Sequence, residues 1–188
     1  FPEGLVKNQK LKSPVITPTT RGTGPGGHDE PITAKEIIKQ KLVPPKIYKQ
    51  IEKVAIKLFA RGSQIAARGG FILADTKYEF GLDRKGKLVL IDEIHTPDSS
   101  RFWLKSTYDS RHKLGEEVEN YDKEVMRIWF RQRGYSGHGK PPQMADSLIV
   151  EVSQRYQAVY EKLTGQKFEI DLATPPKERV IASLSKLV

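Results

Sequence analysis

The sequence contains no cysteine and only two methionines among its 188 residues. A chain without cysteine has no disulfide bonds and no metal site built from thiolates. No stretch comes near the roughly 18 consecutive apolar residues that a membrane-spanning helix requires. We therefore expect a protein with no membrane partner. The lack of cysteine also fits a reducing compartment, and we expect the cytoplasm, with a plastid as the alternative.

The composition is that of a folded protein. Hydrophobic residues make up 37% of the chain, which is enough for a core, and the length fits one domain or one and a half. Residues 1–4 (FPEG) include no initiator methionine and do not begin a signal peptide, in which a basic segment precedes an apolar one. We therefore expect the chain to be part of a longer protein.

The chain is basic, with 32 Lys and Arg residues against 23 Asp and Glu residues and a net charge of +9. Two kinds of ligand fit this charge: nucleic acid, and small polyanions such as ATP or a sugar phosphate. The basic residues are spread through amphipathic segments, as is usual for solvated helix faces. Tyr and Phe fall mostly on apolar helix faces and do not alternate with Lys and Arg on an exposed one. We therefore expect phosphate ligands and no nucleic-acid partner.

The distribution of apolar residues, Pro and Gly divides the chain into two parts. Residues 1–32 hold much of the Pro and Gly and are predicted to form a loop segment that leads into a helical lobe, 33–188. Thr33 and Glu36 have the spacing of a capping box, which opens a short helix. Apolar residues then recur at helical spacing, and Gly or Pro marks the segment ends. The predicted helices cover 33–41, 45–68, 122–133, 144–163 and a segment after 176.

The period of the pattern changes at the centre of the lobe. Residues 71–94 are predicted to form a β-hairpin, with strands 71–82 and 87–94 and a turn at 83–86. The predicted fold class is therefore α+β, with a small antiparallel sheet packed among helices.

The first predicted strand carries charged residues on one face. Side chains alternate along a strand, so Asp75, Lys77 and Glu79 point the same way. A simple four-residue turn puts Asp92 of the second strand on that face as well. A bulge at the turn would shift the register by one residue and put Glu93 there instead.

This charged face has two interpretations. Clustered carboxylates repel one another unless a cation lies among them, and magnesium binds one or two carboxylates together with nucleotide phosphates. Lys77 would then contact a phosphate or the substrate anion. Alternatively, the acids and Lys77 form ion pairs on solvent-facing strands. Pattern alone favours this second interpretation, because exposed strand faces are commonly charged.

A polar segment follows the predicted hairpin directly. Arg101 carries a fork of donors suited to a carboxylate or a phosphate. Asp98, Ser99 and Ser100 have side chains that stabilise a turn or that hydrogen-bond a ribose or an amine. The alternative is purely structural: a tight turn anchored in the core by the aromatic side chains of Phe102 and Trp103.

Two long stretches, 73–81 (LADTKYEFG) and 91–103 (IDEIHTPDSSRFW), resemble the signature motifs of the SAICAR synthetase family, in the same order and at the same separation. Nearly the whole chain takes part in this resemblance. Shorter similarities lie in residues 2–5, 9–11, 17–20, 27–30, 122–123 and 156–165. The resemblance implies a lobe of a kinase-like, ATP-grasp-like two-lobed enzyme of purine biosynthesis. In this family ATP phosphorylates an imidazole carboxylate, and the amino group of aspartate attacks the resulting acyl phosphate.

The resemblance also implies roles for individual residues. Glu79 and Asp92 would hold magnesium on the ATP phosphates, and Lys77 would contact nucleotide phosphate or substrate. Lys77 and Asp75 would be the catalytic residues. Arg21 stands where the family often has a nucleotide-contacting Lys, and Arg binds phosphate with a different geometry. The residues that would contact the ribonucleotide substrate are His28, Asp29, Asp75, Asp98, Ser99 and Arg101.

The sequence departs from the family pattern in one respect. Family members begin with a β-rich lobe that covers ATP, followed by a segment of the pattern Arg-x-x-x-x-Gly-Ser for the substrate phosphate, and neither is present in these 188 residues. The Gly-rich segment 22–27 is no substitute, because it does not lie between a strand and a helix. The resemblance therefore implies an N-terminal lobe as partner, with this fragment alone inactive. A non-catalytic binding or regulatory lobe is the alternative, and the family often forms homodimers.

Overall fold

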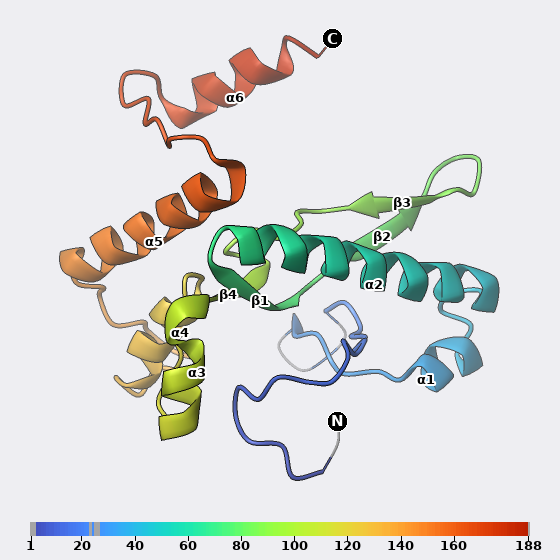
Figure 1. Cartoon of the computed structure of the whole chain (residues 1–188). Coiled ribbons are helices and arrows are strands. Elements are labelled where there is room, and N and C mark those ends of the chain that lie inside the picture. Colours follow the sequence, from blue (N-terminus) through green and yellow to red (C-terminus); the bar gives the residue numbers. More distant parts are fainter. Residues whose placement is uncertain (1–2, 23, 25–26, 188) are drawn as a thin grey trace.

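The computed structural model describes residues 3–22, 24 and 27–187, so Thr23, Pro25 and Gly26 of the predicted 22–27 loop lie outside the described residues. In the described residues the short strands lie between two groups of helices along the chain (Figure 1). The elements, in order, are α1 (Ala34–Lys39), α2 (Pro45–Arg68), β1 (Phe71–Thr76), β2 (Glu79–Leu82), β3 (Leu88–Ile91), β4 (Ser100–Leu104), α3 (Lys105–Leu114), α4 (Glu124–Arg131), α5 (Asp146–Thr164) and α6 (Pro176–Leu184).

The helices begin where local chemistry favours it. The predicted capping box opens α1: the Thr33 hydroxyl accepts the Glu36 N–H at 3.2 Å, and the Glu36 carboxylate accepts the Thr33 N–H at 2.8 Å. Pro45 is the first residue of α2, where a backbone N–H would have no partner within the helix. Proline, which lacks this N–H, therefore costs the helix no hydrogen bond there. These helices, together with α4, α5 and α6, confirm the helical predictions. The helix α3 was not predicted, and residues 105–114 had been assigned to a polar connection.

The single predicted hairpin is replaced by two separate two-stranded antiparallel sheets. The predicted first strand breaks after Thr76, and its two halves pair with different partners. β1 pairs with β4, which lies in the segment expected to form a turn, and β2 pairs with β3 as a true hairpin. The mixed helix and antiparallel-sheet composition was predicted correctly, but the strand connections were not.

A bulge in β1 decides which of its side chains are buried. Phe71 faces Leu104 and Leu73 faces Phe102, but the register then shifts so that Asp75 faces Arg101, with one residue of β1 left unpaired. Strict alternation would have placed Asp75 on the same buried side as Phe71 and Leu73. The bulge instead leaves Asp75 exposed.

The core lies where α2 and α5 meet the β1–β4 sheet. Phe71 and Phe102 are each 1% exposed and their rings meet edge to face, 6.0 Å between centroids. Ala66 of α2 and Val159 of α5 fill the space beside them. Because both strands anchor in this core, residues 75–76 and 100–101 at their ends are held in fixed positions.

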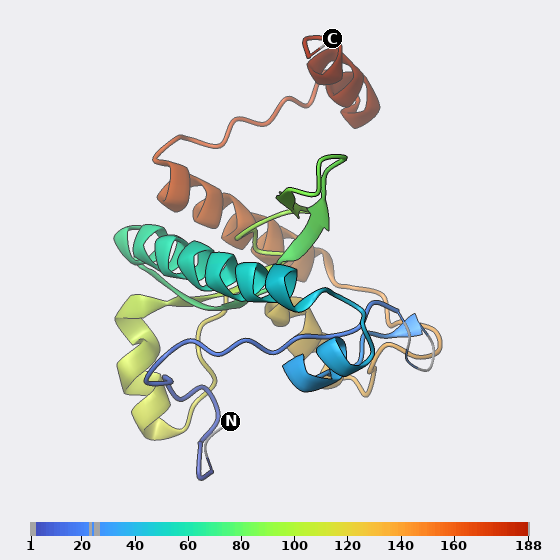
Figure 2. The same cartoon turned by 90° about the vertical axis from the view of Figure 1, so that its right-hand side faces the viewer.

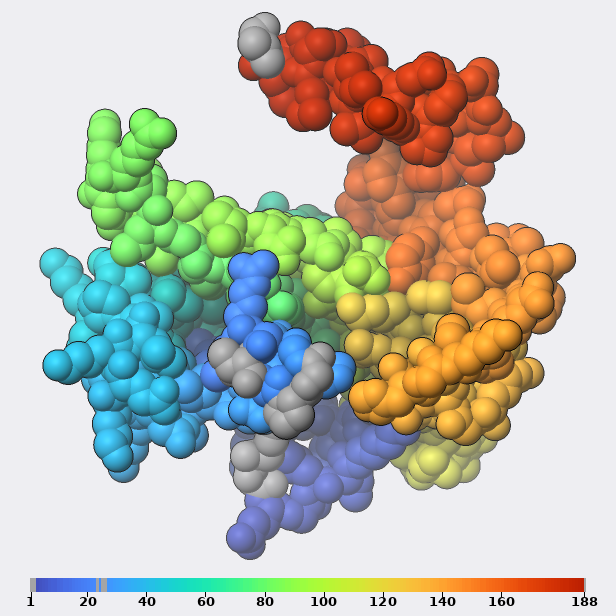
Figure 3. Space-filling model, turned by 180° about the vertical axis from the view of Figure 1, so that it is seen from behind, coloured from blue at the N-terminus to red at the C-terminus, as the bar shows by residue number. Residues whose placement is uncertain are grey.

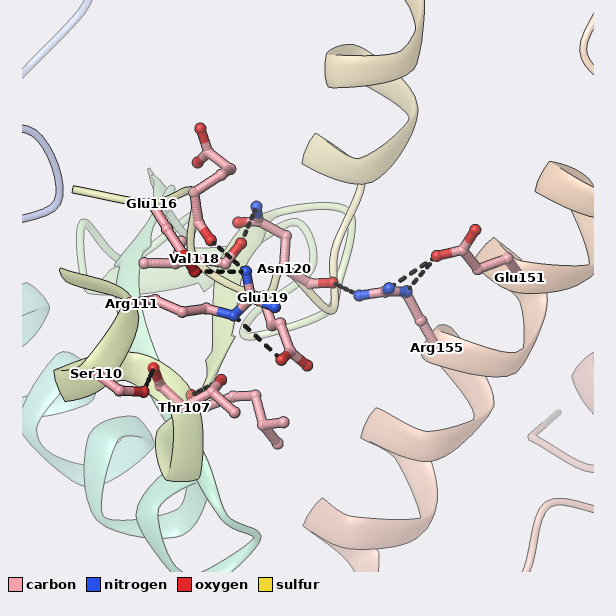
Figure 4. A network of polar contacts seen from close by, with 11 residues as sticks. Thr107, Ser110, Arg111, Glu116, Val118, Glu119, Asn120, Glu151 and Arg155 are labelled. Carbon is pink, nitrogen blue, oxygen red and sulfur yellow. Dashed lines mark hydrogen bonds and ion pairs between the residues drawn. The ribbon is translucent and has the colours of Figure 1, made fainter. Parts of the chain in front are cut away.

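A polar network secures the connection after α3 (Figure 4). The Arg111 guanidinium donates to the Glu117 carbonyl and pairs with Glu119 at 3.3 Å. From the other side, Arg155 of α5 donates to the Asn120 carbonyl and pairs with Glu151 at 2.7 Å. The network joins α3 and α5 through residues 116–120, which follow α3 in the chain.

The C-terminal part extends away from the body of the protein. Residues 165–175 leave α5 as an open segment, and α6 lies apart from the other helices (Figure 2). Apolar side chains of α6 are more than half exposed. No helix of the described residues is long and apolar enough to cross a membrane.

Candidate active site

The break between β1 and β2 exposes charged side chains. Lys77 belongs to neither strand, and its N–H donates to the Ser99 carbonyl at 3.2 Å. Lys77 and Glu79 still lie on one side, as alternation predicted, and their charged atoms are 3.0 Å apart. The segment before α1 passes over this point: the chain around residue 20 lies against the strands in Figure 3.

Four charged residues meet at this break, and they are called the charge cluster below: Arg21, Asp29, Lys77 and Glu79. Arg21 lies 3.3 Å from Glu79, and Lys77 lies 3.5 Å from Asp29. The hydrogen bond to Glu79 and the nearby carboxylate charges raise the pKa of Lys77. The Asp29 carboxylate accepts the Gly22 N–H, and this hydrogen bond lowers the pKa of Asp29 most. The positive charges of Lys77 and Arg21 lower it further. Arg21 and Lys77 supply the positive charges beside the carboxylates of Asp29 and Glu79. The predicted repulsion between these acids is therefore already relieved by the protein's own side chains.

Asp75 and Arg101 form a second group beside the charge cluster. They face each other across the β1–β4 sheet, and their side chains form an ion pair. Both side chains are about half exposed. Each was predicted to contact substrate, and the structure brings them together with each other instead of with Lys77 or Glu79.

The turn before β4 carries Asp98 and Ser99. Ser99 exchanges hydrogen bonds with Thr96: each backbone N–H donates to the hydroxyl of the other residue, at 3.1 and 3.2 Å. Ser99 therefore has a structural role in the turn. Asp98 is exposed and pairs with Lys123 at 4.0 Å. A ligand could displace such a long, exposed pair with little loss of stability.

Asp92 follows β3 directly, and the pairing of β2 with β3 decides between the two registers that the sequence left open. The structure pairs Glu79 with Ile91, one residue away from the simple-turn register, which paired Glu79 with Leu90. Gly86 adopts a φ of 74° and closes the turn by donating to the Asp83 carbonyl, which matches the bulged alternative. Asp92 itself is exposed and has a φ of 66°, a left-handed conformation that is uncommon outside Gly, Asn and Asp. Alternation alone would not turn its side chain to the face of Glu79.

His28 lies at the edge of the site. It is exposed, and its ring meets that of His138 edge to face, with 6.1 Å between centroids. His138 comes from the Gly-rich segment between α4 and α5, which lines a hollow of about 620 Å³ with Arg133, Tyr135 and Lys140. The predicted substrate residues His28 and Asp29 are neighbours in the chain. His28 lies beside His138 of the hollow, and Asp29 belongs to the charge cluster.

Sequence reasoning missed three groups beside the site. Asp122 is 1% exposed, and its carboxylate accepts the Phe102 and Glu124 N–H groups, both at 2.8 Å. Burial raises the pKa of Asp122 to about 6. Tyr156 of α5 is half-buried; burial and then the charges of Asp98 and Asp122 raise its pKa to about 12. In the sequence, Asp122 and Tyr156 stood out only as members of the minor similarities 122–123 and 156–165.

The third group, Tyr78 and His95, lies behind the charge cluster. Their side chains are joined by a 2.5 Å hydrogen bond between the Tyr78 hydroxyl and His95 Nε2. Burial raises the pKa of Tyr78 to about 12 and lowers that of His95. No sequence pattern had connected the two residues.

The side chains of the site supply only part of the ligands that a metal ion requires. Among the described residues, no group of three or more His, Asp and Glu side chains could hold a metal ion by itself. Magnesium, however, commonly uses one or two carboxylates and takes the remaining ligands from nucleotide phosphates and water. Glu79 and Asp92 lie at the same end of the β2–β3 hairpin, since the partner of Glu79 precedes Asp92 in the chain. The chemistry of this donor set fits magnesium bound with a nucleotide.

Comparison with known proteins identifies the family. The SAICAR synthetase family profile matches residues 1–143. The chain belongs to the SAICAR synthetase family. It is 44% identical over 193 residues to a phosphoribosylaminoimidazole-succinocarboxamide synthase of Legionella pneumophila, covering 99% of this chain and 59% of that protein. A synthase of the same name from Bacteroides thetaiotaomicron is 41% identical, over 96% of this chain and 57% of that protein.

Solved structures of SAICAR synthetases share the fold. The enzyme from Saccharomyces cerevisiae, complexed with SAICAR, superposes with a TM-score of 0.72 at 34% identity, covering 90% of this chain and 52% of that one. A SAICAR synthetase in complex with ADP has a TM-score of 0.64 at 28% identity, covering 88% of this chain and 57% of that one. The chain thus spans less than three fifths of the length of the relatives and structures named here.

Proposed function

We propose that this chain forms one wall of the active site of an enzyme that ligates L-aspartate to carboxyaminoimidazole ribonucleotide, using ATP and releasing SAICAR, ADP and phosphate. The observation that carries this proposal is the charge cluster, found in a chain whose relatives are named as synthases of this kind. A magnesium-bound nucleotide needs carboxylates for the metal and cations for the phosphates, and the cluster offers the Glu79 carboxylate and the cations of Arg21 and Lys77.

The proposed reaction has two steps. A carboxylate oxygen of the imidazole substrate attacks the γ-phosphorus of ATP, and the bond from that phosphorus to ADP breaks. The amino nitrogen of aspartate then attacks the carbon of the acyl phosphate, loses a proton and displaces phosphate. Phosphoryl transfer depends mainly on positioning and on stabilising charge. We therefore assign Lys77 to the transferred phosphoryl group and Asp75 to orienting the imidazole substrate.

Glu79 and Asp92 are the proposed magnesium ligands, and Arg21 and Lys77 the contacts to nucleotide phosphate. When bound, magnesium would neutralise charge on the transferred phosphoryl group. The position of Asp92 supports this assignment, because it follows Ile91, the strand partner of Glu79, at the same end of the hairpin. Glu79 already contacts both cations, so it would share its charge between them and the metal.

The remaining predicted residues are proposed to bind the ribonucleotide. The Arg101 fork would take the phosphate, exchanging its present partner Asp75 for the ligand. The exposed Asp98 would contact the imidazole or ribose, with Ser99 holding the turn. His28 and Asp29 would close the opposite edge. The structure of the yeast enzyme with SAICAR supports an imidazole ribonucleotide ligand for this fold.

We further propose a second, N-terminal lobe in a longer protein, which covers the nucleotide as in kinase-like and ATP-grasp-like enzymes. The support is the length of the relatives, of which this chain spans less than three fifths. The division into a loop segment, 1–32, and a helical lobe, 33–188, belongs to the same proposal. We expect the whole protein in the cytoplasm, as a homodimer.

The test is a coupled ADP-release assay with ATP, carboxyaminoimidazole ribonucleotide and aspartate. We expect turnover from the longer protein that contains this chain, and none from the 188-residue chain alone. Omitting aspartate separates ligation from simple ATP hydrolysis. Turnover by the chain alone at the rate of a complete synthase would refute the need for a second lobe. If the longer protein binds ADP but never forms SAICAR, the chain is the alternative, a non-catalytic binding lobe.

A further inference from the structure

The Tyr78–His95 pair links the two segments that carry the proposed magnesium ligands. Tyr78 lies between Lys77 and Glu79 in the chain, and His95 follows Asp92 by three residues. The Tyr78 hydroxyl lies 2.5 Å from His95 Nε2, and the rings meet at 72°, with 5.5 Å between centroids. Both side chains are half-buried. The pair therefore joins the strand segment of Glu79 to the turn of Asp92 from the side away from solvent.

A glycine in the neighbouring helix makes room for this pair. A Cβ atom placed on Gly62 of α2 would lie 2.3 Å from Cε1 of the His95 ring, closer than non-bonded carbon atoms approach. Gly is unfavourable in the interior of a helix such as α2, because it lowers helix propensity relative to Ala. The close approach of the ring gives this position a packing role. Gly62 thus fixes how deeply His95 lies against α2.

Few other contacts hold the turn that carries Asp92. Within the described part of the chain, the Tyr78 contact is the only hydrogen bond or ion pair that joins residues 92–95 to residues outside 92–99. His95 has a φ of 53° and Asp92 one of 66°, both in the left-handed region. Such conformations persist where surrounding contacts impose them. For this turn, the buried His95 ring is the contact that does so.

We propose that Tyr78 and His95 are positioning residues for the divalent-cation site: their hydrogen bond, seated against Gly62, holds the Asp92 carboxylate within reach of the cation that Glu79 binds. This inference rests on the proposed role of Glu79 and Asp92. Neither Tyr78 nor His95 touches the cation. Their effect is to keep the turn from adopting other conformations in which Asp92 points into solvent.

The first test measures cation affinity directly. Mn²⁺ replaces Mg²⁺ as a probe, and its binding to the longer protein that contains this chain is titrated by electron paramagnetic resonance with excess ADP. Only binding that Glu79→Gln abolishes is counted, which excludes other acidic sites. Tyr78→Phe keeps the ring and removes the hydroxyl. We expect its Mn²⁺ dissociation constant to rise about tenfold, which corresponds to about 1.4 kcal/mol.

The matched control is Tyr160→Phe. The Tyr160 hydroxyl also donates a side-chain hydrogen bond, to Gln166 at 3.2 Å, but at the end of α5. This variant should bind Mn²⁺ as the unchanged chain does. Thermal melts are recorded for Tyr78→Phe and Tyr160→Phe. If the loss of Mn²⁺ affinity came from general destabilisation, two variants with equally lowered melting temperatures would lose equal affinity.

Two further variants reach the same ring from other directions. Gly62→Ala should displace His95 and weaken Mn²⁺ binding to a similar degree, and adding it to Tyr78→Phe should cost little more, because both act through one contact. His95→Gln, whose amide reaches the place of Nε2, should retain more affinity than His95→Leu. Additive effects of Gly62→Ala and Tyr78→Phe would contradict a shared mechanism.

The outcomes separate this inference from the proposed function. If the unchanged chain binds Mn²⁺ through Glu79 and Asp92 but Tyr78→Phe and Gly62→Ala bind it equally well, the positioning role is refuted and the cation site stands. If the unchanged chain shows no Mn²⁺ binding that depends on Glu79 and Asp92, both proposals fail. A tenfold loss of Mn²⁺ affinity in Tyr78→Phe and Gly62→Ala, with unchanged melting temperature and an unaffected Tyr160→Phe, supports the positioning role of Tyr78 and His95.

Discussion

Replacing Asp122 by Asn should change how the stability of the protein depends on pH. Asp122 is 1% exposed, and burial raises the pKa of its carboxyl from 3.8 to about 6, although two backbone N–H groups donate to it. The folded protein therefore holds the proton of Asp122 more tightly than the unfolded chain does. The corresponding contribution to stability is fully present below about pH 4 and is lost as pH rises through about 6.

The size of the effect follows from the two pKa values. They differ by about two units, and each unit corresponds to about 1.4 kcal/mol, so ionising Asp122 should lower the free energy of unfolding by about 3 kcal/mol. Asn cannot ionise and resembles the protonated carboxyl in shape. All other groups titrate in both proteins and cancel in the comparison. Between pH 4 and pH 7, which covers most of this titration, the difference in unfolding free energy should therefore shift by about 2 kcal/mol in favour of Asp122→Asn.

The assay is urea unfolding followed by tryptophan fluorescence at several pH values and constant ionic strength. Asp171→Asn is the matched control, because exposed Asp171 accepts the Ala173 and Thr174 N–H groups and has a lowered pKa. Its contribution has the opposite sign: it is present above pH 4 and lost as pH falls. A difference between Asp122→Asn and the unchanged chain that stays constant from pH 4 to 7 would refute this account of the buried carboxyl.

Three further predictions concern the core and the site. Phe102→Ala removes a fully buried ring and should lower the unfolding free energy by about 3–5 kcal/mol in urea titrations; a loss below 1 kcal/mol would contradict the assigned core. In the longer enzyme, Arg101→Lys should mainly raise the apparent KM for the ribonucleotide, because a point charge replaces a fork; an unchanged KM with a lower kcat would contradict phosphate binding. Glu79→Gln or Asp92→Asn should lower kcat about a hundredfold, or about 3 kcal/mol, with partial rescue by excess magnesium and little change in melting temperature. Lower melting temperatures with normal turnover would make these acids structural.

The helices could be predicted because their signals are local. The capping box of α1 and the prolines and glycines around α2 act within a few residues of the helix ends. The helix α3 has a local end signal in Gly115, but only Tyr108 among its residues is buried and no apolar stripe marks it. The pairing of β1 with β4 was missed because it depends on the shared core around Phe71 and Phe102, which are 31 positions apart.

The candidate site was predictable in its residues but not in its contacts. The resemblance supplied Lys77 and Glu79, and strand alternation placed them on one side. Nothing in the sequence indicated that Asp29, 48 positions earlier, would reach Lys77, because that contact depends on the path of the whole N-terminal segment. The sequence left the hairpin register open, because one extra residue in the turn at Gly86 shifts the pairing without changing either strand.

The separate pairing of β1 and β2 gives the site a mechanical property. The β1–β4 sheet is anchored in the core and carries Asp75 and Arg101, whereas the β2–β3 hairpin carries Glu79 and projects from the body (Figure 1). Residues 77–78 connect them without belonging to either ladder. Tilting the hairpin about this link would break no hydrogen bond within either sheet, but it would break or strain the bond from the Lys77 N–H to the Ser99 carbonyl and the Tyr78–His95 bond. The spacing between the proposed nucleotide side and the ribonucleotide side therefore depends on two contacts of the connecting residues and not on the ladders of the sheets.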